Sequence, residues 1–137
     1  MEIYTGTDII EIDRIKDAIK SDTFIKKIFT EKEIEYCESK KDPARIQSYA
    51  ARFAAKEAIF KAISKVLPLD YGIEWKSIEI LKEETGRPYV NLKIDNKKKA
   101  KIKNRCKFIT YKRLCSSNSS CYLWRIKILI KLIDNSK

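Results

Sequence analysis

Histidine is absent from this 137-residue chain, and its four cysteines form no Cys-x-x-Cys pair. Without these ligands a zinc site is not expected, and the cysteines are interpreted as free thiols of a reducing compartment. No apolar run is long enough to cross a bilayer, and the first residues lack the basic-then-apolar plan of a secretory signal. We therefore expect a cytoplasmic protein without membrane association, long enough for one domain with its own core.

Glycine and proline are also scarce, with three of each, and all six precede residue 89. Residues 1–92 contain 16 Lys and Arg against 17 Asp and Glu, whereas residues 93–137 contain 14 against 2. The formal net charge of +11 therefore arises wholly from the C-terminal third. Such a tail would suit a nucleic-acid-binding module, but runs of like charge are usually solvated, and the interleaved aromatic and glycine residues of RNA-binding sheets are missing.

The N-terminal third predicts one strand and three short helices. Alternation and β-branched residues favour a strand over residues 2–11, where Gly6 indicates a bulge or a close backbone approach. Asp13 is predicted to cap a helix over about residues 14–20, and a second helix follows the Ser/Asp pair of SDTFIKKIF. Thr30, with Glu33 three residues later, has capping-box spacing and predicts the third helix.

The middle of the chain predicts one long helix and a hairpin. The helix is expected over about residues 43–66, and the hairpin has strands near 76–82 and from about 88. Two later pieces, 107–111 and 121–133, are strand-like, although the second could equally be an apolar helix. This order predicts an α+β fold, a small antiparallel sheet packed on one long helix and several short ones.

Charged residues recur on the long helix, within YAARFAAKEAIFKA. Glu57 and Lys61 share one helical face, and Arg52 and Lys56 form a second pair with the same spacing. On spacing alone, Glu57 and Lys61 are an ordinary surface ion pair. Combined with Asp8 of the first strand, however, Glu57 could supply carboxylate oxygens to Mg²⁺, and Lys61 could neutralise phosphate charge. The pattern is thus compatible with phosphate transfer or pyrophosphate cleavage.

Three motifs together closely resemble the holo-[acyl-carrier-protein] synthase family of 4′-phosphopantetheinyl transferases. They are TGTDIIEIDRI at 5–15, RFAAKEAIFKA at 52–62 and IEI…GRPYV at 78–90, in that order. The resemblance covers residues 1 to about 92. It implies Mg²⁺-dependent transfer of 4′-phosphopantetheine from coenzyme A to a serine of apo acyl carrier protein, with release of adenosine 3′,5′-bisphosphate, in fatty acid biosynthesis.

The resemblance also assigns roles to individual residues. Asp8 and Glu57 would be the metal ligands and, with Lys61, the catalytic residues. Arg14 would face the acidic carrier protein. A homotrimer with active sites between subunits is implied as well. Coenzyme A would be bound by a larger set of residues: Arg52, Lys56, Lys61, Gly86, Arg87 and Pro88.

Residues 93–137 depart from the family, which usually continues with a Ser-x-Ser-His motif and an Ala/Val-rich strand. A shifted reading frame would explain this. AT-rich codons for residues 103–124, read one nucleotide later, permit KIDVSLSHIKDYAVAIVVVIYG, which restores both features.

We therefore divide the domain into a family-like part, 1–92, and an aberrant basic part, 93–137. As written, the tail is expected to leave the sheet incomplete, to expose an aggregation-prone CYLWRIKILIKLI and to weaken folding or activity. An inactive coenzyme A-binding family member is the alternative.

Overall fold

The computed structural model describes residues 2–64, 73–93, 106–115 and 122–132. Four α-helices, a short 3₁₀ helix and five β-strands fall within these ranges, which confirms an α+β fold. Within the described segments, no helix is both long and apolar enough to cross a membrane. In chain order the elements are β1 (Glu2–Glu11), α1 (Ile12–Ala18), α2 (Asp22–Ile28), α3 (Glu31–Glu38), α4 (Ala44–Ile63), η2 (Trp75–Ser77), β2 (Ile78–Lys82), β3 (Pro88–Leu92), β4 (Cys106–Cys115) and β5 (Tyr122–Leu132).

The short helices begin where their capping residues predict. Ser21 accepts a hydrogen bond from the Phe24 amide at the start of α2. Thr30 and Glu33 form the predicted capping box of α3, with each side chain accepting from the other residue's amide. Asp13 is the exception: it lies inside the first turn of α1 rather than before it. There its negative charge complements the positive end of the helix dipole instead of capping an amide.

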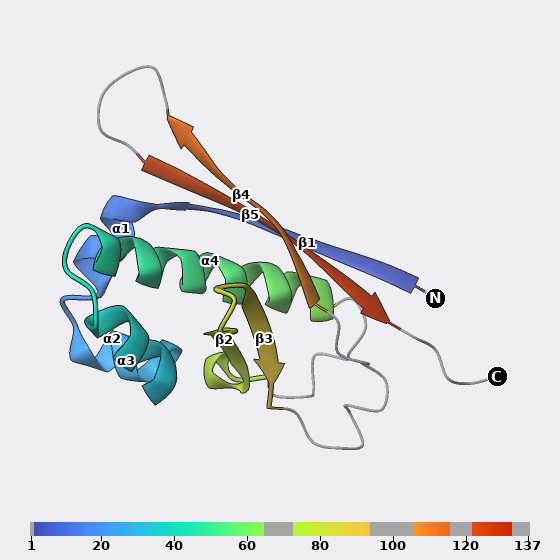
Figure 1. Cartoon of the computed structure of the whole chain (residues 1–137), viewed down its shortest axis with the longest axis horizontal. Helices are drawn as coiled ribbons and strands as arrows, with labels where there is room; N and C mark the ends of the chain where they lie inside the picture. Colours follow the sequence, from blue (N-terminus) through green and yellow to red (C-terminus); the bar gives the residue numbers. More distant parts are fainter. Residues whose placement is uncertain (1, 65–72, 94–105, 116–121, 133–137) are drawn as a thin grey trace.

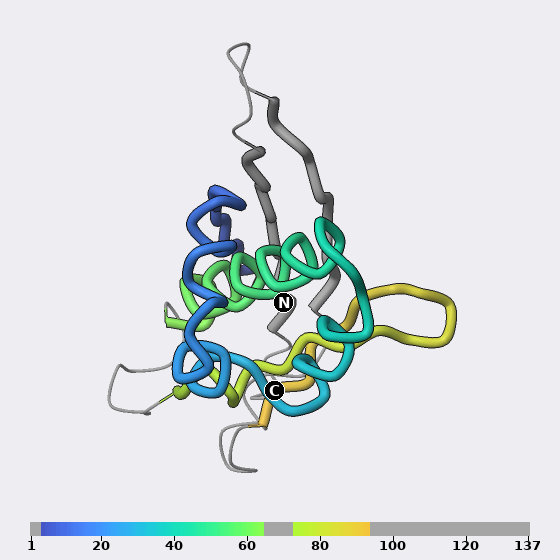
Figure 2. Tube along the Cα trace, turned by 90° about the vertical axis from the view of Figure 1, so that its left-hand side faces the viewer, coloured from blue at the N-terminus to red at the C-terminus, as the bar shows by residue number. Residues whose placement is uncertain are grey.

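Two antiparallel sheets flank α4 (Figure 1). One has the order β1-β5-β4, and the other is the β2-β3 hairpin. The hairpin turn is closed by a hydrogen bond from the Gly86 amide to the Glu83 carbonyl, and Gly86 has φ 83°, a conformation that favours glycine. Figure 2 shows this turn projecting from the body of the molecule. Residues 76 and 77, predicted as strand, belong to η2 instead, so β2 begins only at Ile78.

The C-terminal strands correct the expectation that the tail would leave the sheet incomplete. β5 pairs with β1 from Glu2↔Leu132 to Glu11↔Leu123, and β4 pairs with the other edge of β5. The second strand-like piece is thus a central strand and not a helix, because its backbone groups are matched on both sides. β5 is therefore not an edge strand of this sheet, while the predicted exposure of CYLWRIKILIKLI stays a prediction. The boundary at residue 92 and the shifted frame remain predictions.

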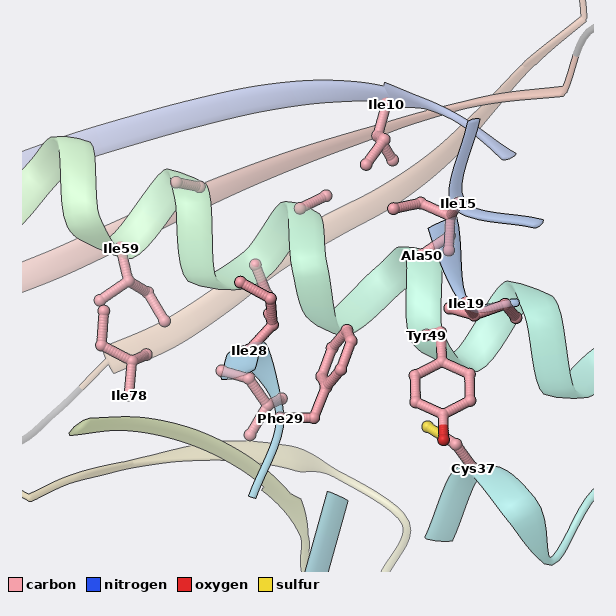
Figure 3. Packing of buried hydrophobic residues seen from close by; sticks show 14 of the residues in the cluster. Ile10, Ile15, Ile19, Ile28, Phe29, Cys37, Tyr49, Ala50, Ile59 and Ile78 are labelled. Atoms are coloured by element: carbon pink, nitrogen blue, oxygen red, sulfur yellow. The ribbon is translucent and has the colours of Figure 1, made fainter. Parts of the chain in front are cut away.

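The core surrounds α4 and includes residues of β1, the short helices and the β2–β3 hairpin (Figure 3). Ile10 and Ile15 approach α4 from β1 and α1, while Ile59 of α4 meets Ile78 of β2. Small residues permit this close packing: a Cβ added to Gly6 would lie 1.7 Å from the Ala58 carbonyl oxygen. The predicted close approach at Gly6 is therefore confirmed, and it holds β1 directly against the helix that carries Glu57.

Candidate functional site

Asp8 and Lys61 meet where β1 crosses α4. The Lys61 ammonium lies 2.8 Å from Asp8 Oδ1, while Asp8 is only 14% exposed and Lys61 is 51% exposed. Glu57 stands one helical turn before Lys61 and is half-buried. Burial raises the pKa of Glu57, the negative charge of Asp8 raises it further, and Lys61 lowers it. The strand and the helix thus bring together two carboxylates and one ammonium, as the sequence predicted for these three residues.

A cavity of about 390 Å³ adjoins this charged cluster. Asp8 and Glu57 line it together with Arg14 from α1. Its remaining lining residues are apolar: Ile9, Ile10, Ile15, Ala18, Phe24 and Phe53. The cavity can therefore hold a partly apolar group beside the two carboxylates, and Arg14 can attract an anionic partner to its rim.

Asp8 and Glu57 suit a hard divalent cation by their chemistry, because both offer carboxylate oxygens on one cavity wall. Over the described ranges, no group of three or more histidine, cysteine, aspartate or glutamate side chains gathers as a metal site. Two carboxylates match the way Mg²⁺ is usually held, with remaining positions filled by water and substrate phosphate. The donor set therefore fits Mg²⁺ when phosphate is also present.

A second cavity, of about 470 Å³, is bordered by α3, the start of α4 and the β2–β3 hairpin. Gly86, Pro88 and Arg52 line it, and so do two lysines that sequence reasoning missed, Lys40 and Lys82. It shares no lining residue with the first cavity. The structure therefore places Arg52 and Gly86 in the same cavity. This cavity is separate from the one that Asp8 and Glu57 line.

Three cations surround the Tyr36 ring in this second cavity. The centroid lies 4.1 Å from Arg52 Cζ, 4.8 Å from Lys40 Nζ and 5.1 Å from Lys82 Nζ. Burial by itself would raise the pKa of the Tyr36 hydroxyl, but the two lysines outweigh it and the pKa is lowered. Among the described residues none of the three cations forms an ion pair. This concentration of positive charge around a cavity favours an anion.

Arg52 adds a specific donor to that cavity. It is 6% exposed, its Nη1 donates to the Ser48 carbonyl, and its buried Nε has no hydrogen-bond partner in the described structure. Buried donors are seldom left unmatched, so this nitrogen is suited to a ligand oxygen. The missed Lys40 could have been found from the sequence, because Tyr36 and Lys40 are spaced to share a helical face.

Lys56 and Arg87, two of the predicted coenzyme A-binding residues, line neither cavity. Lys56 has no exposed surface and its ammonium forms a buried ion pair with Glu33, 2.7 Å away. No phosphate can reach it there, so its predicted contact with coenzyme A is not supported. Arg87 is exposed at the hairpin turn and does not line the second cavity, unlike its neighbours Gly86 and Pro88. The i, i+4 spacing of Arg52 and Lys56 therefore does not produce a joint anion site.

Known proteins resemble this chain in sequence and in fold. Residues 4–110 match the model of the 4′-phosphopantetheinyl transferase superfamily. A holo-[acyl-carrier-protein] synthase of Ruminiclostridium cellulolyticum is 53% identical over 94 residues, which are 67% of this chain and 68% of that protein. The corresponding protein of a Thermoanaerobacter species is 43% identical over 94 residues, 68% of this chain and 64% of that protein. The matched segment therefore spans about two thirds of these relatives.

The fold is shared with solved structures over nearly the whole chain. The ACPS–CoA complex of Chronobacterium ammoniagenes superimposes with a TM-score of 0.71, covering 98% of this chain and all of that one. Only 19% of the residues are identical, so this likeness concerns the fold. The structural match covers 98% of this chain and therefore extends beyond residue 110, where the match to the family model ends.

Proposed function

Because this chain belongs to the 4′-phosphopantetheinyl transferase superfamily, we propose that it transfers 4′-phosphopantetheine from coenzyme A to a serine of an apo acyl carrier protein. The serine oxygen forms a bond to the β-phosphorus, the bond to the bridging oxygen breaks, and adenosine 3′,5′-bisphosphate leaves. The serine proton is released. The observation that carries the proposal is the convergence of Asp8, Glu57 and Lys61 beside the first cavity. The names of the matched relatives support the same reaction.

Each member of this cluster has a physical task. Asp8 and Glu57 would hold Mg²⁺, which when bound polarises the pyrophosphate. Lys61 binds a phosphate oxygen and compensates the negative charge that develops on the leaving group. Its exposed ammonium can reach a ligand, and the hydrogen bond to Asp8 raises the pKa of Lys61, which keeps it protonated. The apolar wall formed by Ile15 and Phe53 excludes water from the reacting groups.

The second cavity is proposed to hold the phosphate-rich adenosine end of coenzyme A. The unmatched Arg52 Nε donates to a phosphate oxygen, and Lys40 and Lys82 provide further positive charge. Gly86 and Pro88 form the wall at the hairpin turn. This assignment keeps the predicted roles of Arg52, Gly86 and Pro88 and replaces Lys56 by two lysines.

The separation of the two cavities supports an active site shared between subunits, which the homotrimer implied by the motif resemblance would provide. The α4 residues that line the second cavity extend as far as Arg52. The α4 residues that line the first cavity are Phe53 and Glu57, which lie on an adjacent face of the helix. We propose that the second cavity of one subunit meets the Asp8–Glu57 cluster of its neighbour, so that coenzyme A spans the interface. Arg14 at the rim of the first cavity then faces the acidic carrier protein. A cytoplasmic location and a role in fatty acid biosynthesis belong to the same proposal.

Mass spectrometry of the carrier protein tests the reaction. With coenzyme A and Mg²⁺, apo acyl carrier protein should gain the mass of one phosphopantetheine arm. Asp8→Ala and Glu57→Ala should each abolish the gain, while Glu31→Ala, an exposed carboxylate that lines neither cavity, should not. Full activity of both site variants would refute the metal assignment. A coenzyme A titration alongside identifies the inactive alternative, since that protein would bind coenzyme A without transferring the arm.

A further inference from the structure

Lys56 and Glu33 form an ion pair that has no exposed surface at all. The Lys56 ammonium lies 2.7 Å from Glu33 Oε2 and donates to the carbonyls of Ile28, at 2.9 Å, and Trp75, at 3.1 Å. All three of its donors are therefore used. Burial lowers the pKa of Lys56, and the charge of Glu33 opposes that shift. Such a fully satisfied group is held in one position.

Glu33 is equally constrained. Its Oε2 accepts from the Thr30 amide at 2.9 Å as well as from Lys56, and its Oε1 accepts from the Ile80 amide at 2.8 Å. The pair thus joins the middle of α4 to the end of α2, the start of α3, η2 and β2. β2 continues into the hairpin whose turn lines the second cavity.

Lys56 also directly precedes Glu57, the proposed metal ligand, on α4. Successive residues of an α-helix are about 100° apart, so anchoring Lys56 in the core sets the direction of Glu57. A helix with side chains has a radius of about 5–6 Å, so a rotation of roughly 20° would displace the Glu57 carboxylate by about 2 Å. Metal–oxygen distances hold to within about 0.2 Å. A rotation of this size would therefore break the metal site.

We propose that the Lys56–Glu33 pair is a positioning device that fixes the rotation of α4 and thereby aims Glu57 at the metal shared with Asp8. The inference rests on the proposed function, because it assumes that Glu57 is a metal ligand. An ion pair suits this task better than an apolar contact. Apolar side chains can slide while remaining buried, whereas the directional hydrogen bonds of Lys56 to Glu33 and to the carbonyls of Ile28 and Trp75 cannot all be kept in a rotated helix.

Stability and positioning can be separated because buried ion pairs contribute little net stability. Removing one partner leaves an unpaired charge and is strongly destabilising, whereas removing both charges is often tolerated. The test compares wild type with Lys56→Met, Glu33→Gln and the double variant. Glu79→Gln is the matched control: Glu79 of β2 is another buried carboxylate, and its hydrogen-bond partners Thr30, Asn91 and Lys93 all lie outside α4. Its charge acts on Lys56, so this variant perturbs the surroundings of Lys56 without removing a bond to α4.

Two quantities are measured for each protein: the denaturant midpoint and the dissociation constant for Mn²⁺, a paramagnetic stand-in for Mg²⁺, with saturating coenzyme A present to supply the phosphate oxygens. We expect the double variant to regain most of the midpoint lost in Lys56→Met. Its Mn²⁺ affinity should nevertheless stay about tenfold or more below wild type, the usual effect of losing a residue that orients a metal ligand. Glu79→Gln should bind Mn²⁺ as wild type does.

A double variant with restored midpoint and Mn²⁺ affinity within about twofold of wild type would overturn the proposal and leave the pair a purely stabilising role. If the double variant does not fold, Glu33→Asp replaces it, because it keeps both charges but shortens the anchor. Weakened Mn²⁺ binding there supports positioning, and unchanged binding overturns it.

Transfer by wild type is assayed in parallel. Mn²⁺ binding without transfer would reject the proposed reaction alone, whereas wild type that binds no Mn²⁺ would reject the positioning role.

Discussion

Gly6→Ala should separate β1 from α4 and disable the candidate site. The new Cβ would lie 1.7 Å from the Ala58 carbonyl oxygen, 2.7 Å from its carbon and 3.2 Å from Ala62 Cβ. Carbon–oxygen contacts need roughly 3.5 Å, so the strand and the helix must part by more than about 1.5 Å. The two closest atoms belong to the helix backbone, so no rotamer change can relieve the clash. Asp8, two residues along on the same face of β1, would move with the strand.

The expected cost lies at the upper end of the overpacking range, about 3 kcal/mol, which corresponds to a fall in Tm of roughly 10 °C for a chain of this size. Transfer should fall further than stability alone explains, because Asp8 retreats from Lys61 and Glu57. Thermal unfolding followed by circular dichroism measures the first effect. Steady-state transfer at a temperature where both proteins remain folded measures the second.

Two controls isolate the clash from other effects of an added methyl group or a strand substitution. Thr7→Ala alters the neighbouring exposed position of β1 and should change stability by no more than about 0.5 kcal/mol. Gly86→Ala meets no atom within 4 Å but has φ +83°, so it should cost only the strain of that conformation, about 1–2 kcal/mol. If Gly6→Ala melted within about 2 °C of wild type and kept full transfer, the close approach of β1 to α4 would be refuted.

Three further outcomes follow from the same structure. Lys82→Met and Lys40→Met should each raise the KM for coenzyme A by roughly tenfold with little change in kcat, and an unchanged KM would remove the second cavity from coenzyme A binding. Burial raises the pKa of Cys37 to about 12, so Cys37 should resist iodoacetamide at neutral pH until the protein unfolds, as peptide mapping would show. The hydrogen bond from Arg45 lowers the pKa of Glu38, so their pairing stabilises above the ordinary glutamate pKa and is lost as pH falls. The stability difference between Arg45→Ala and wild type should therefore shrink in acid, and a constant difference would contradict this.

Local patterns predicted much of this fold because they act over a few residues. The capping box at Thr30 and Glu33 forms as expected, since it needs only one helical turn. Helix α4 lies within its predicted range for the same reason: its apolar and small residues recur at helical spacing. The tail was harder, because a short apolar run gives no periodicity that separates helix from strand. Pairing with β1, more than a hundred residues away in sequence, makes it a strand.

The site shows the same division between local and distant causes. The sequence by itself determined that Glu57 and Lys61 share a face, and the motif resemblance joined Asp8 to them. The sequence could not distinguish Lys56 from its charged neighbours, because a helical spacing does not say which face meets the core. Only the tertiary structure decided that Lys56 is buried against Glu33 while Lys61 reaches Asp8. The physical reason is that burial of a charge depends on partners supplied by distant segments, and those partners exist only once the chain has folded.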